Sequence, residues 1–247
     1  MSTPSQSEPL APEVLADLEA WTRLSGWYRL HIKAVQRYYR ALGEPRPFRV
    51  VDVGCGLGGL LEEIAIWADS AGMEVQLTGV DPSPALVAHA QERLGVRAMI
   101  RAGSLLSADG PPQRYDLATA TLVLNQLSGP DRLRLLAELG RAAQTAYVFD
   151  VTPTVAGEMG ARLIPWLTGL GQAPPTAWIR TLERAPTVDE VVKLVAHLPV
   201  QVSRVFPSAV ATHPEPRRRV KVDSDSAERA KIEFRTPKIK GAVVGSG

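Results

Sequence analysis

The stretch Val50-Val51-Asp52-Val53-Gly54-Cys55-Gly56-Leu57-Gly58-Gly59 decides the fold of this 247-residue chain. A short apolar run ends in a glycine-rich turn, and an apolar pattern with helical spacing follows from Leu60 until Gly72. Glycines let the backbone between a strand and a helix pass close to a ligand, and the N-terminus of the helix offers free N–H groups. The stretch therefore predicts a nucleotide site at a strand-to-helix turn.

Outward from this turn, strand patterns alternate with helix patterns. Strands are predicted at 48–53, 75–80, 96–100, 117–122 and 146–151, and helices at 60–71, 84–94 and 129–143. A capping box at Thr187 and Glu190 opens a further helix, and a terminal antiparallel pair is predicted at 201–206 and 208–212. Because strands alternate with helices of this length, we expect an α/β fold with a mostly parallel sheet covered on both faces.

Composition and charge exclude several classes of protein. Apolar residues make up 45% of the chain and charged residues 22%, as in soluble proteins that bury a core. The net charge is +2, and nine Lys or Arg face five Asp or Glu from Pro214 onward, so the body is mildly acidic and no nucleic-acid partner is expected. One cysteine and four scattered histidines predict no metal site. We expect a cytoplasmic protein without membrane insertion.

Two acidic residues indicate which ligand the glycine turn binds. Gly54, Gly56 and Gly59 also satisfy G-x-G-x-x-G, so a nicotinamide-dependent oxidoreductase remains an alternative. Asp52 stands two residues before the first glycine, where a carboxylate suits a ligand with positive charge better than a pyrophosphate. Asp81 ends the next predicted strand, where it can accept bonds from two ribose hydroxyls, and it follows Gly54 by 27 positions rather than about 20.

With these motifs, residues 48–152 resemble the class I S-adenosylmethionine-dependent methyltransferases, particularly the small-molecule group that includes quinone-biosynthesis methyltransferases. The first motif resembles Asp52–Gly58, the acidic second motif falls on Asp81, and the fourth-strand motif resembles Tyr115–Leu124. The resemblance implies a Rossmann-like, doubly wound sheet with S-adenosyl-L-methionine as the cofactor and S-adenosyl-L-homocysteine as the product. It implies in-line transfer of a methyl group to oxygen, carbon or nitrogen of a small molecule.

The resemblance also implies which residues contact the cofactor. They are Asp52, Gly54, Cys55, Gly56, Asp81, Pro82, Ser104, Leu105, Ala120 and Thr121. Ser104 stands where the family often has an acid, and Asn125 and Gln126 stand where close relatives often carry histidines. These departures leave open a second alternative, a non-catalytic S-adenosylmethionine-binding protein or partner subunit.

The segments outside the common core are expected to select the methyl acceptor. The helical pattern of residues 12–43 holds five of the fourteen aromatic residues, which indicates either ordinary packing or a lid over the cofactor. The catalytic candidates are His31, Tyr28 and Asn125, and the candidates for acceptor binding are Trp27, Asn125 and Trp166. Their apolar and aromatic character favours a hydrophobic or aromatic small-molecule acceptor.

The domain organisation follows from these regions. We expect a disordered N-terminus at 1–11, a helical lid at 12–43, a class I methyltransferase domain at 44–213 and a basic C-terminal extension at 214–247. The protein is expected to be a monomer or a homodimer.

Overall fold

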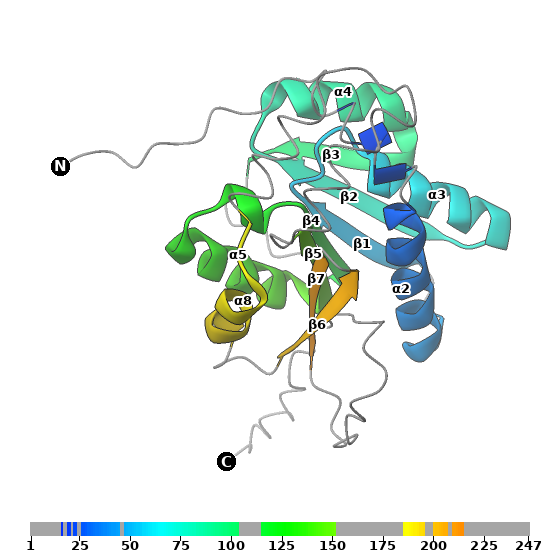
Figure 1. Ribbon diagram of the computed structural model, residues 1–247. Helices are drawn as coiled ribbons and strands as arrows, with labels where there is room; N and C mark the ends of the chain where they lie inside the picture. The colour runs from blue at the N-terminus through cyan, green and yellow to red at the C-terminus, as the bar shows by residue number, and fades with distance from the viewer. Residues whose placement is uncertain are drawn as a thin grey trace, which may run out of the picture.

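The computed structural model describes residues 16, 19, 20, 22, 23, 26–44, 47–103, 115–151, 185–195, 200–206 and 209–214. Within this part of the chain, helices cover both faces of a seven-stranded sheet whose strand order is β3-β2-β1-β4-β5-β7-β6 (Figure 1). The strands are β1 (Phe48–Val53), β2 (Val75–Asp81), β3 (Ala98–Ala102), β4 (Tyr115–Thr121), β5 (Ala143–Val151), β6 (Val200–Phe206) and β7 (Ala209–Pro214). The helices are α2 (Trp27–Ala41), α3 (Gly59–Ala71), α4 (Pro84–Leu94), α5 (Gly129–Ala142) and α8 (Val188–Val195), with 3-10 turns η1 (Gly95–Arg97) and η3 (Leu124–Gln126).

The first five strands are parallel, so the expected α/β fold with a mostly parallel sheet is confirmed. β1 lies between β2 and β4. Because the three strands are parallel, their carboxyl ends lie at the same edge of the sheet. β7 runs antiparallel to β5, and β6 runs antiparallel to β7. Both strands fall where the sequence pattern places its last two strands.

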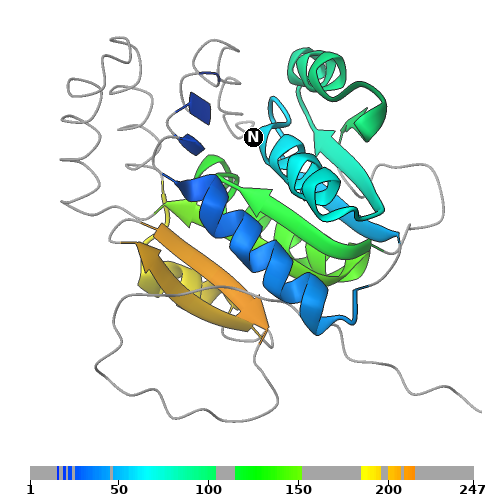
Figure 2. The same cartoon turned by 90° about the vertical axis from the view of Figure 1, so that its right-hand side faces the viewer.

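Two helical layers enclose the sheet. Figures 1 and 2 show α2 and α3 on one face and α5 with α8 on the opposite face. Because both faces are covered, the central strands are largely buried, and five of the six residues of β1 are buried, Asp52 among them.

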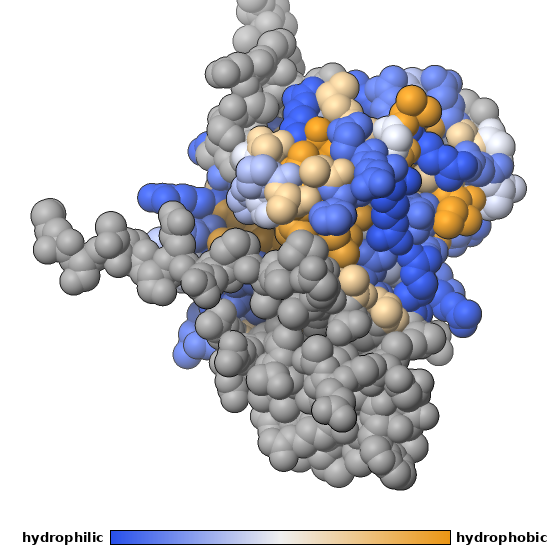
Figure 3. Space-filling model, turned by 90° about the horizontal axis from the view of Figure 1, so that it is seen from above, coloured by the Kyte–Doolittle hydropathy of each residue, from blue (hydrophilic) through white to orange (hydrophobic). Residues whose placement is uncertain are grey.

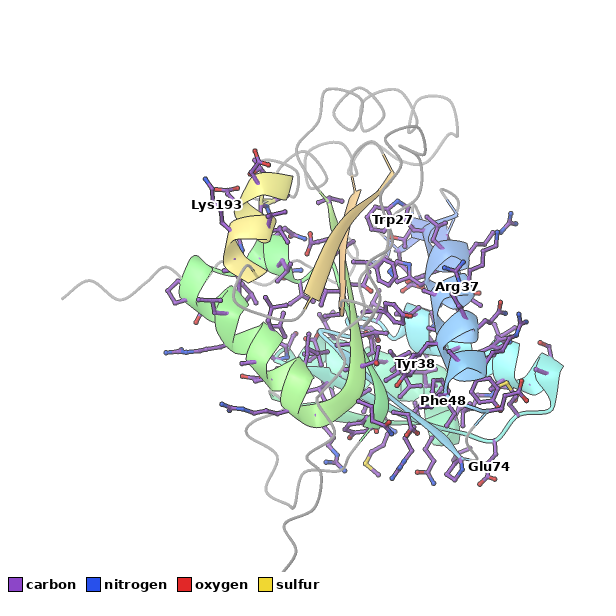
Figure 4. All side chains as sticks on the ribbon, turned by 90° about the horizontal axis from the view of Figure 1, so that it is seen from below. Trp27, Arg37, Tyr38, Phe48, Glu74 and Lys193 are labelled. Atoms are coloured by element: carbon purple, nitrogen blue, oxygen red, sulfur yellow. The ribbon has the colours of Figure 1, made fainter. Side chains whose placement is uncertain are left out.

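Helix α2 is part of the core along its C-terminal half. The Tyr38 ring lies edge-on to Tyr147, with centroids 6.3 Å apart, and its hydroxyl donates to the carbonyl of Asp116 over 3.0 Å. Tyr39 packs edge-on against Phe48 at 5.1 Å. Figure 4 shows Tyr38 and Phe48 on the side of α2 that faces the sheet, with Trp27 at the other end of the helix. These aromatic residues therefore do the ordinary packing that the sequence left as one of two interpretations.

A network of five charged residues ties the segment before α2 to α3 and α4. We call it the Arg93 network, and its members are Glu19, Arg23, Glu62, Glu63 and Arg93. Arg93 lies 2.6 Å from both Glu19 and Glu62, and it also donates to the carbonyl of Leu57 in the glycine turn over 3.3 Å. The network therefore connects residues 19–23 to the edge of the sheet that carries the glycine turn.

Several strand boundaries differ from the predicted ones, including the start of β4, which lies at Tyr115 rather than at 117, and two of these differences have local reasons. β3 begins at Ala98 rather than at 96, because Gly95 has a φ of 53° and the chain makes a 3-10 turn before it extends. β5 begins at Ala143 rather than at 146, since α5 ends at Ala142 and passes directly into the strand. No helix among the described residues is long and apolar enough to cross a membrane.

Candidate functional site

The glycine turn between β1 and α3 has one open position. Gly54 and Gly56 have φ angles of 69° and 53°, a left-handed conformation that other residues rarely adopt. A Cβ atom on Gly54 would lie 2.6 Å from Cγ2 of Val123, so the turn packs tightly there. A Cβ atom on Gly56 would meet no atom within 4 Å. The backbone at Gly56 therefore faces the space where a ligand can approach.

Asp81 fastens this turn to the end of the next strand. Its Oδ2 accepts a hydrogen bond from the backbone N–H of Gly56 over 3.0 Å, and its Oδ1 accepts one from Ser83 over 2.9 Å. Burial raises the pKa of Asp81, while these two N–H groups act to lower it. Each carboxylate oxygen retains a further lone pair, so the side chain can still accept bonds from ligand hydroxyls. Pro82, next to it, is exposed.

Asp52 is a buried acid near the end of β1. Its Oδ1 accepts a hydrogen bond of 2.7 Å from the hydroxyl of Thr119, its register partner on β4. Burial raises its pKa from 3.8 to about 7, and the charge of Asp81 adds to this rise while the Thr119 bond opposes it. A cationic ligand beside Asp52 would favour its ionised form.

The side chain of Cys55 points into the core rather than toward a ligand. A Cβ atom on Gly79 of β2 would lie 2.9 Å from the Cys55 sulfur, so the thiol fills the notch that this glycine leaves. Burial raises the pKa of the thiol well above its usual range, which keeps it protonated and unreactive. Cys55 can offer a ligand only its backbone.

Tyr28 brings the N-terminal half of α2 to the glycine turn. A Cβ atom on Gly59 would collide with the Tyr28 hydroxyl, so this hydroxyl lies against the start of α3. Burial raises the pKa of Tyr28 well above its usual range, and the charges of Glu19 and Asp52 contribute to the rise. Tyr28 is therefore a protonated hydroxyl close to the buried acid.

His31 lies one helical turn further along α2, and it is 1% exposed. Its Nδ1 lies 2.7 Å from the carbonyl oxygen of Trp27, which is itself buried. Burial lowers the pKa of His31 to about 4, so the ring is neutral at physiological pH. At the carboxyl end of β4, Ala120 is fully buried and Thr121 is half-buried.

Asp150, which the sequence analysis missed, organises the end of β5. Its Oδ2 accepts from the backbone N–H groups of Leu124 (2.6 Å) and Asn125 (3.3 Å), and its Oδ1 accepts from the Asn125 amide over 2.8 Å. Burial raises its pKa to about 6, while these hydrogen bonds lower it. An acid ending the fifth predicted strand, at the same edge as Asp52 and Asp81, is the signal that would have found it.

The chain between β4 and η3 is strained. Leu122 has a φ of 59°, in the left-handed region that a bulky side chain avoids, and its N–H donates to the carbonyl of Phe149 over 2.8 Å. Backbone of this kind costs about 1–3 kcal/mol and is concentrated at functional sites. The turn places η3 next to Asp150, and the side-chain amide of Asn125 stabilises the turn by donating a hydrogen bond to this acid.

The structure brings most of the predicted site residues to one edge of the sheet. Residues Asp52, Gly54, Gly56, Asp81, Ala120, Thr121 and Asn125 all lie at or next to the carboxyl ends of β1, β2 and β4. Ser104, Leu105 and Trp166 lie outside the described residues. The open glycine, the free lone pairs of Asp81 and the buried acid Asp52 fit a ligand that carries hydroxyl groups and a positive charge, as an adenosyl sulfonium does. Among the described residues, no cluster of His, Cys, Asp or Glu is arranged to hold a metal.

The sequence matches a known family and a curated relative. The family model described as "Methyltransferase domain" matches residues 50–145. The magnesium-protoporphyrin O-methyltransferase of Rhodobacter capsulatus is 34% identical over 112 residues, which cover 44% of this chain and 46% of that protein. The match thus spans about half the length of this relative.

Solved structures share the fold at low sequence identity. The plantazolicin methyltransferase BpumL, solved in complex with SAH, aligns with a TM-score of 0.61 and 14% identity over 83% of this chain and 90% of that one. A SAM-dependent methyltransferase from Aquifex aeolicus aligns with a TM-score of 0.55 and 18% identity over 83% and 97% of the two chains. Figure 3 views the molecule from above, and the part of this surface that the structure describes is mostly hydrophilic with apolar residues between.

Proposed function

We propose that this chain is a class I, S-adenosylmethionine-dependent methyltransferase that transfers a methyl group to a small hydrophobic or aromatic molecule, which the methyltransferase-domain match of residues 50–145 supports. The observation that carries the proposal is the junction of the glycine turn with β2, where Asp81 binds the N–H of an open Gly56 beside the buried Asp52. This arrangement offers acceptors for hydroxyl groups and a negative charge within one edge of the sheet.

When bound, S-adenosylmethionine supplies a methyl group that its sulfonium already makes electrophilic. The chain then mainly has to hold and align the reactants, and positioning of this kind supplies roughly 7–11 kcal/mol of barrier reduction. Asp81 binds the ribose hydroxyls through its remaining lone pairs, and the missing side chain at Gly56 lets the backbone approach the ligand. Asp52, once ionised, attracts the cationic end.

The N-terminal half of α2 is proposed to close the site. Tyr28 lies against the start of α3, and the Arg93 network holds Glu19 beside the glycine turn. Closure excludes water, which strengthens electrostatic interactions within the site. Tyr38 and Tyr39 pack against the core in the C-terminal half of α2, so only its N-terminal half is proposed to act as the lid.

The curated relative suggests one acceptor to test. Its name assigns it O-methylation of magnesium protoporphyrin, a flat aromatic macrocycle, and it is 34% identical over the matched 112 residues. A flat apolar acceptor agrees with the aromatic character of the predicted acceptor region. We therefore include magnesium protoporphyrin in the acceptor panel, beside smaller phenols, aromatic carboxylic acids and amines.

The first experiment is isothermal titration of the full chain with S-adenosylmethionine, S-adenosylhomocysteine and NADH. We expect the two adenosyl ligands to bind and NADH not to bind, followed by transfer of a labelled methyl group to a member of the panel. Binding of NADH alone would indicate an oxidoreductase instead. Adenosyl binding without transfer to any acceptor would favour a non-catalytic binding protein.

Asp81→Ala provides the matching test of the site. We expect it to weaken S-adenosylmethionine binding by more than tenfold, because the ribose loses its acceptor and the turn loses its bond to β2. Asp69→Ala is the control, since the Asp69 carboxylate forms an exposed ion pair with Arg97. Equal affinity in the two variants would show that Asp81 does not bind the ligand.

A further inference from the structure

Two buried polar atoms at the carboxyl edge of the sheet have no hydrogen-bond partner. They are Nε2 of His31 and Oγ1 of Thr121, and neither meets a donor or acceptor among the residues that the structure describes. Leaving a buried polar group unpaired costs about 1–3 kcal/mol, so native proteins rarely do so without a reason. One such reason is a ligand that supplies the missing partner.

The two side chains lie beside the same phenyl ring. The His31 ring packs on Phe149 of β5 with centroids 3.8 Å apart. Phe149 is in parallel register with Thr121 of β4, and side chains of directly paired residues point to the same face of a sheet. That face carries α2, because His31 reaches Phe149 from this helix. The two unpaired atoms therefore belong to one small region under the N-terminal half of α2.

This region adjoins the proposed cofactor site. Asp52 is in register with Thr119, two residues before Thr121 on the same strand. Thr121 and Phe149 thus form the next row toward the carboxyl edge, immediately beyond the buried acid. A molecule that approaches the transferred methyl group from beneath α2 would meet both of them.

The hydrogen bond to Trp27 fixes the state of the imidazole. A carbonyl oxygen can only accept, so Nδ1 carries the proton and Nε2 carries a lone pair. Burial keeps this ring neutral. Two titratable groups lie nearby. They are Tyr28 on α2, whose ring centroid is 6.3 Å from that of His31, and Asp52 on β1, whose charge acts on Tyr28. Phe149 on β5 carries no charge. Nε2 is thus a preformed acceptor, and Thr121 offers a hydroxyl that can donate or accept.

Resting on the proposed function, we propose that Nε2 of His31 and Oγ1 of Thr121 receive the O–H group of the methyl acceptor, and that His31 is the base of an O-methylation. The substrate class is a flat apolar molecule whose reacting group is a phenolic O–H, because a carboxylic acid has already lost its proton at neutral pH. The acceptor oxygen forms a bond to the methyl carbon, and the electron pair of the broken methyl–sulfur bond stays with sulfur. The O–H bond breaks with its electrons left on oxygen, and the proton goes to Nε2.

This step preserves the charge of the site. The positive charge that leaves sulfur appears on the imidazole as its proton arrives, so no net charge is created in the buried region. Phe149 lies 3.8 Å from the His31 ring, and the face of an aromatic ring attracts a cation. The imidazolium then returns its proton to water when the product leaves.

The test uses phenol and anisole, which share a flat apolar ring but of which only phenol can donate a hydrogen bond. The full chain, labelled with [¹⁵N]histidine and saturated with S-adenosylhomocysteine, is titrated with each compound. We expect phenol to shift the Nε2 resonance of His31 toward the protonated range and to bind about tenfold more tightly than anisole, as one hydrogen bond allows. An unmoved resonance, equal affinities or no binding of phenol would overturn the proposal.

Variants separate this role from simple packing. His31→Asn keeps a donor for the Trp27 carbonyl and lacks Nε2, so the preference for phenol should vanish. Thr121→Val should reduce the preference. Thr145→Val is the matched control, because Thr145 has a second unpaired buried hydroxyl on β5 but lies four residues before Phe149. A loss of preference in Thr145→Val equal to that in Thr121→Val would contradict the assignment.

Binding of S-adenosylhomocysteine distinguishes two kinds of failure. If the wild-type chain does not bind it, the proposed function fails and this inference falls with it. If it binds while phenol leaves His31 unmoved, only the inference fails. On the acceptor identified by the panel, His31→Asn should lower kcat by at least about 10²-fold, as expected for loss of a general base, with unchanged affinity for S-adenosylhomocysteine.

Discussion

Asp52 is an acid that the fold holds away from water without an ionic partner among the described residues. Its pKa rises from 3.8 to about 7 through burial, so the folded chain keeps a proton that the unfolded chain has lost between these two pH values. Stability contributed by this group is greatest below pH 3.8 and declines as the pH rises toward about 7. In the unliganded protein, Asp52 therefore lowers the free energy of unfolding at neutral pH, where it also supplies a carboxylate that suits a cationic ligand.

Asp52→Asn should remove this decline. The amide oxygen can still accept the hydrogen bond from Thr119, and no charge has to be buried at neutral pH. We expect the variant to be more stable than the wild type at pH 8 and similar to it at pH 4, with each kcal/mol raising Tm by roughly 2–4 °C. Thermal unfolding across this range checks the prediction, with Asp69→Asn as the exposed control. Parallel curves for wild type and Asp52→Asn would contradict it.

Gly56→Ala and Gly95→Ala form a matched pair. Both glycines have a φ of 53°, and a Cβ atom on either would meet nothing within 4 Å. Each substitution should lower stability because a φ of 53° crowds a side chain, and Gly95→Ala should lower it more, since the ψ of −124° at Gly95 lies outside the left-handed helical region. Only Gly56→Ala should also weaken S-adenosylhomocysteine binding, since its methyl group enters the proposed ligand space. Equal affinities measured by titration would place the ligand elsewhere.

Local spacing in the sequence was sufficient to place Asp52, Gly54, Gly56 and Asp81 at the carboxyl ends of β1 and β2. Each lies at the end of a strand or in a turn, and a pattern of glycines and acids reveals such positions. The thiol of Cys55 was harder to place, because its direction depends on the notch at Gly79 of a different strand. The unpaired state of His31 Nε2 depends on everything packed around it, and no local pattern reports that.

At the scale of elements, η3 depends on a residue from a neighbouring strand. Asp150 of β5 accepts two backbone N–H groups of η3 and the side chain of Asn125. The turn that leads into η3 contains the strained Leu122, so the short element would not hold its position by its own hydrogen bonds alone. The clamp therefore fixes the shape of the site beside the end of β4.

Asp150→Asn should loosen η3. An amide offers one oxygen where the carboxylate offers two, so buried N–H groups lose partners at about 1–3 kcal/mol each. Hydrogen exchange should show faster exchange at the amides of Leu124 and Asn125. Asp116→Asn is the control, because Asp116 accepts hydrogen bonds from Arg49 and Gln144 rather than from η3. This substitution should lower the stability of the protein without changing hydrogen exchange in η3. Unchanged protection of η3 in Asp150→Asn would show that the clamp is dispensable.

Element types were predictable from the sequence where one strong signal marked each end. Ser83 and Pro84 begin α4 and Gly95 follows it, as the pattern of caps predicts. The start of β5 was missed by three residues because α5 meets it without a glycine or proline between them. Asp150 was missed because its role rests on the position of η3 in space, which the sequence pattern does not provide.

In the whole molecule, the Arg93 network connects segments that are distant in the sequence. It joins Glu19, before α2, to Glu62 on α3 and Arg93 on α4. Arg97 makes a different pair at the same side of the molecule, an exposed one with Asp69. The two arginines therefore differ in whether they reach the N-terminal segment.

Arg93→Ala should loosen Glu19 at the glycine turn, while Arg23 keeps its ion pairs with Glu62 and Glu63, and Arg97→Ala should leave Glu19 in place. The first variant loses its bonds to Glu19, Glu62 and the Leu57 carbonyl, while the second loses one exposed ion pair. We expect faster hydrogen exchange at the backbone amides of Glu19 and Ala20 in Arg93→Ala, and added salt should weaken the same contacts in the wild type. Similar exchange in both variants would indicate that Arg93 does not hold this segment.

The doubly wound, mostly parallel sheet matches what the family resemblance implied, whereas the position of α2 could not be read from its own pattern. An amphipathic helix shows that one face is buried but not what buries it. Here the partners are Phe48, Tyr147 and Phe149, which come from strands up to about a hundred residues further along the chain.

The central place of β1 has a consequence for synthesis on the ribosome. β2 and β3 can join β1 as soon as residue 102 has been made, but the other edge of β1 waits for β4, which ends at Thr121. At roughly 5–20 residues per second, the nascent chain presents an unpaired strand edge for about 1–4 s between these two points. We expect ribosome-associated chaperones to bind this edge in nascent chains of intermediate length. We also expect chains that terminate before β4 to aggregate.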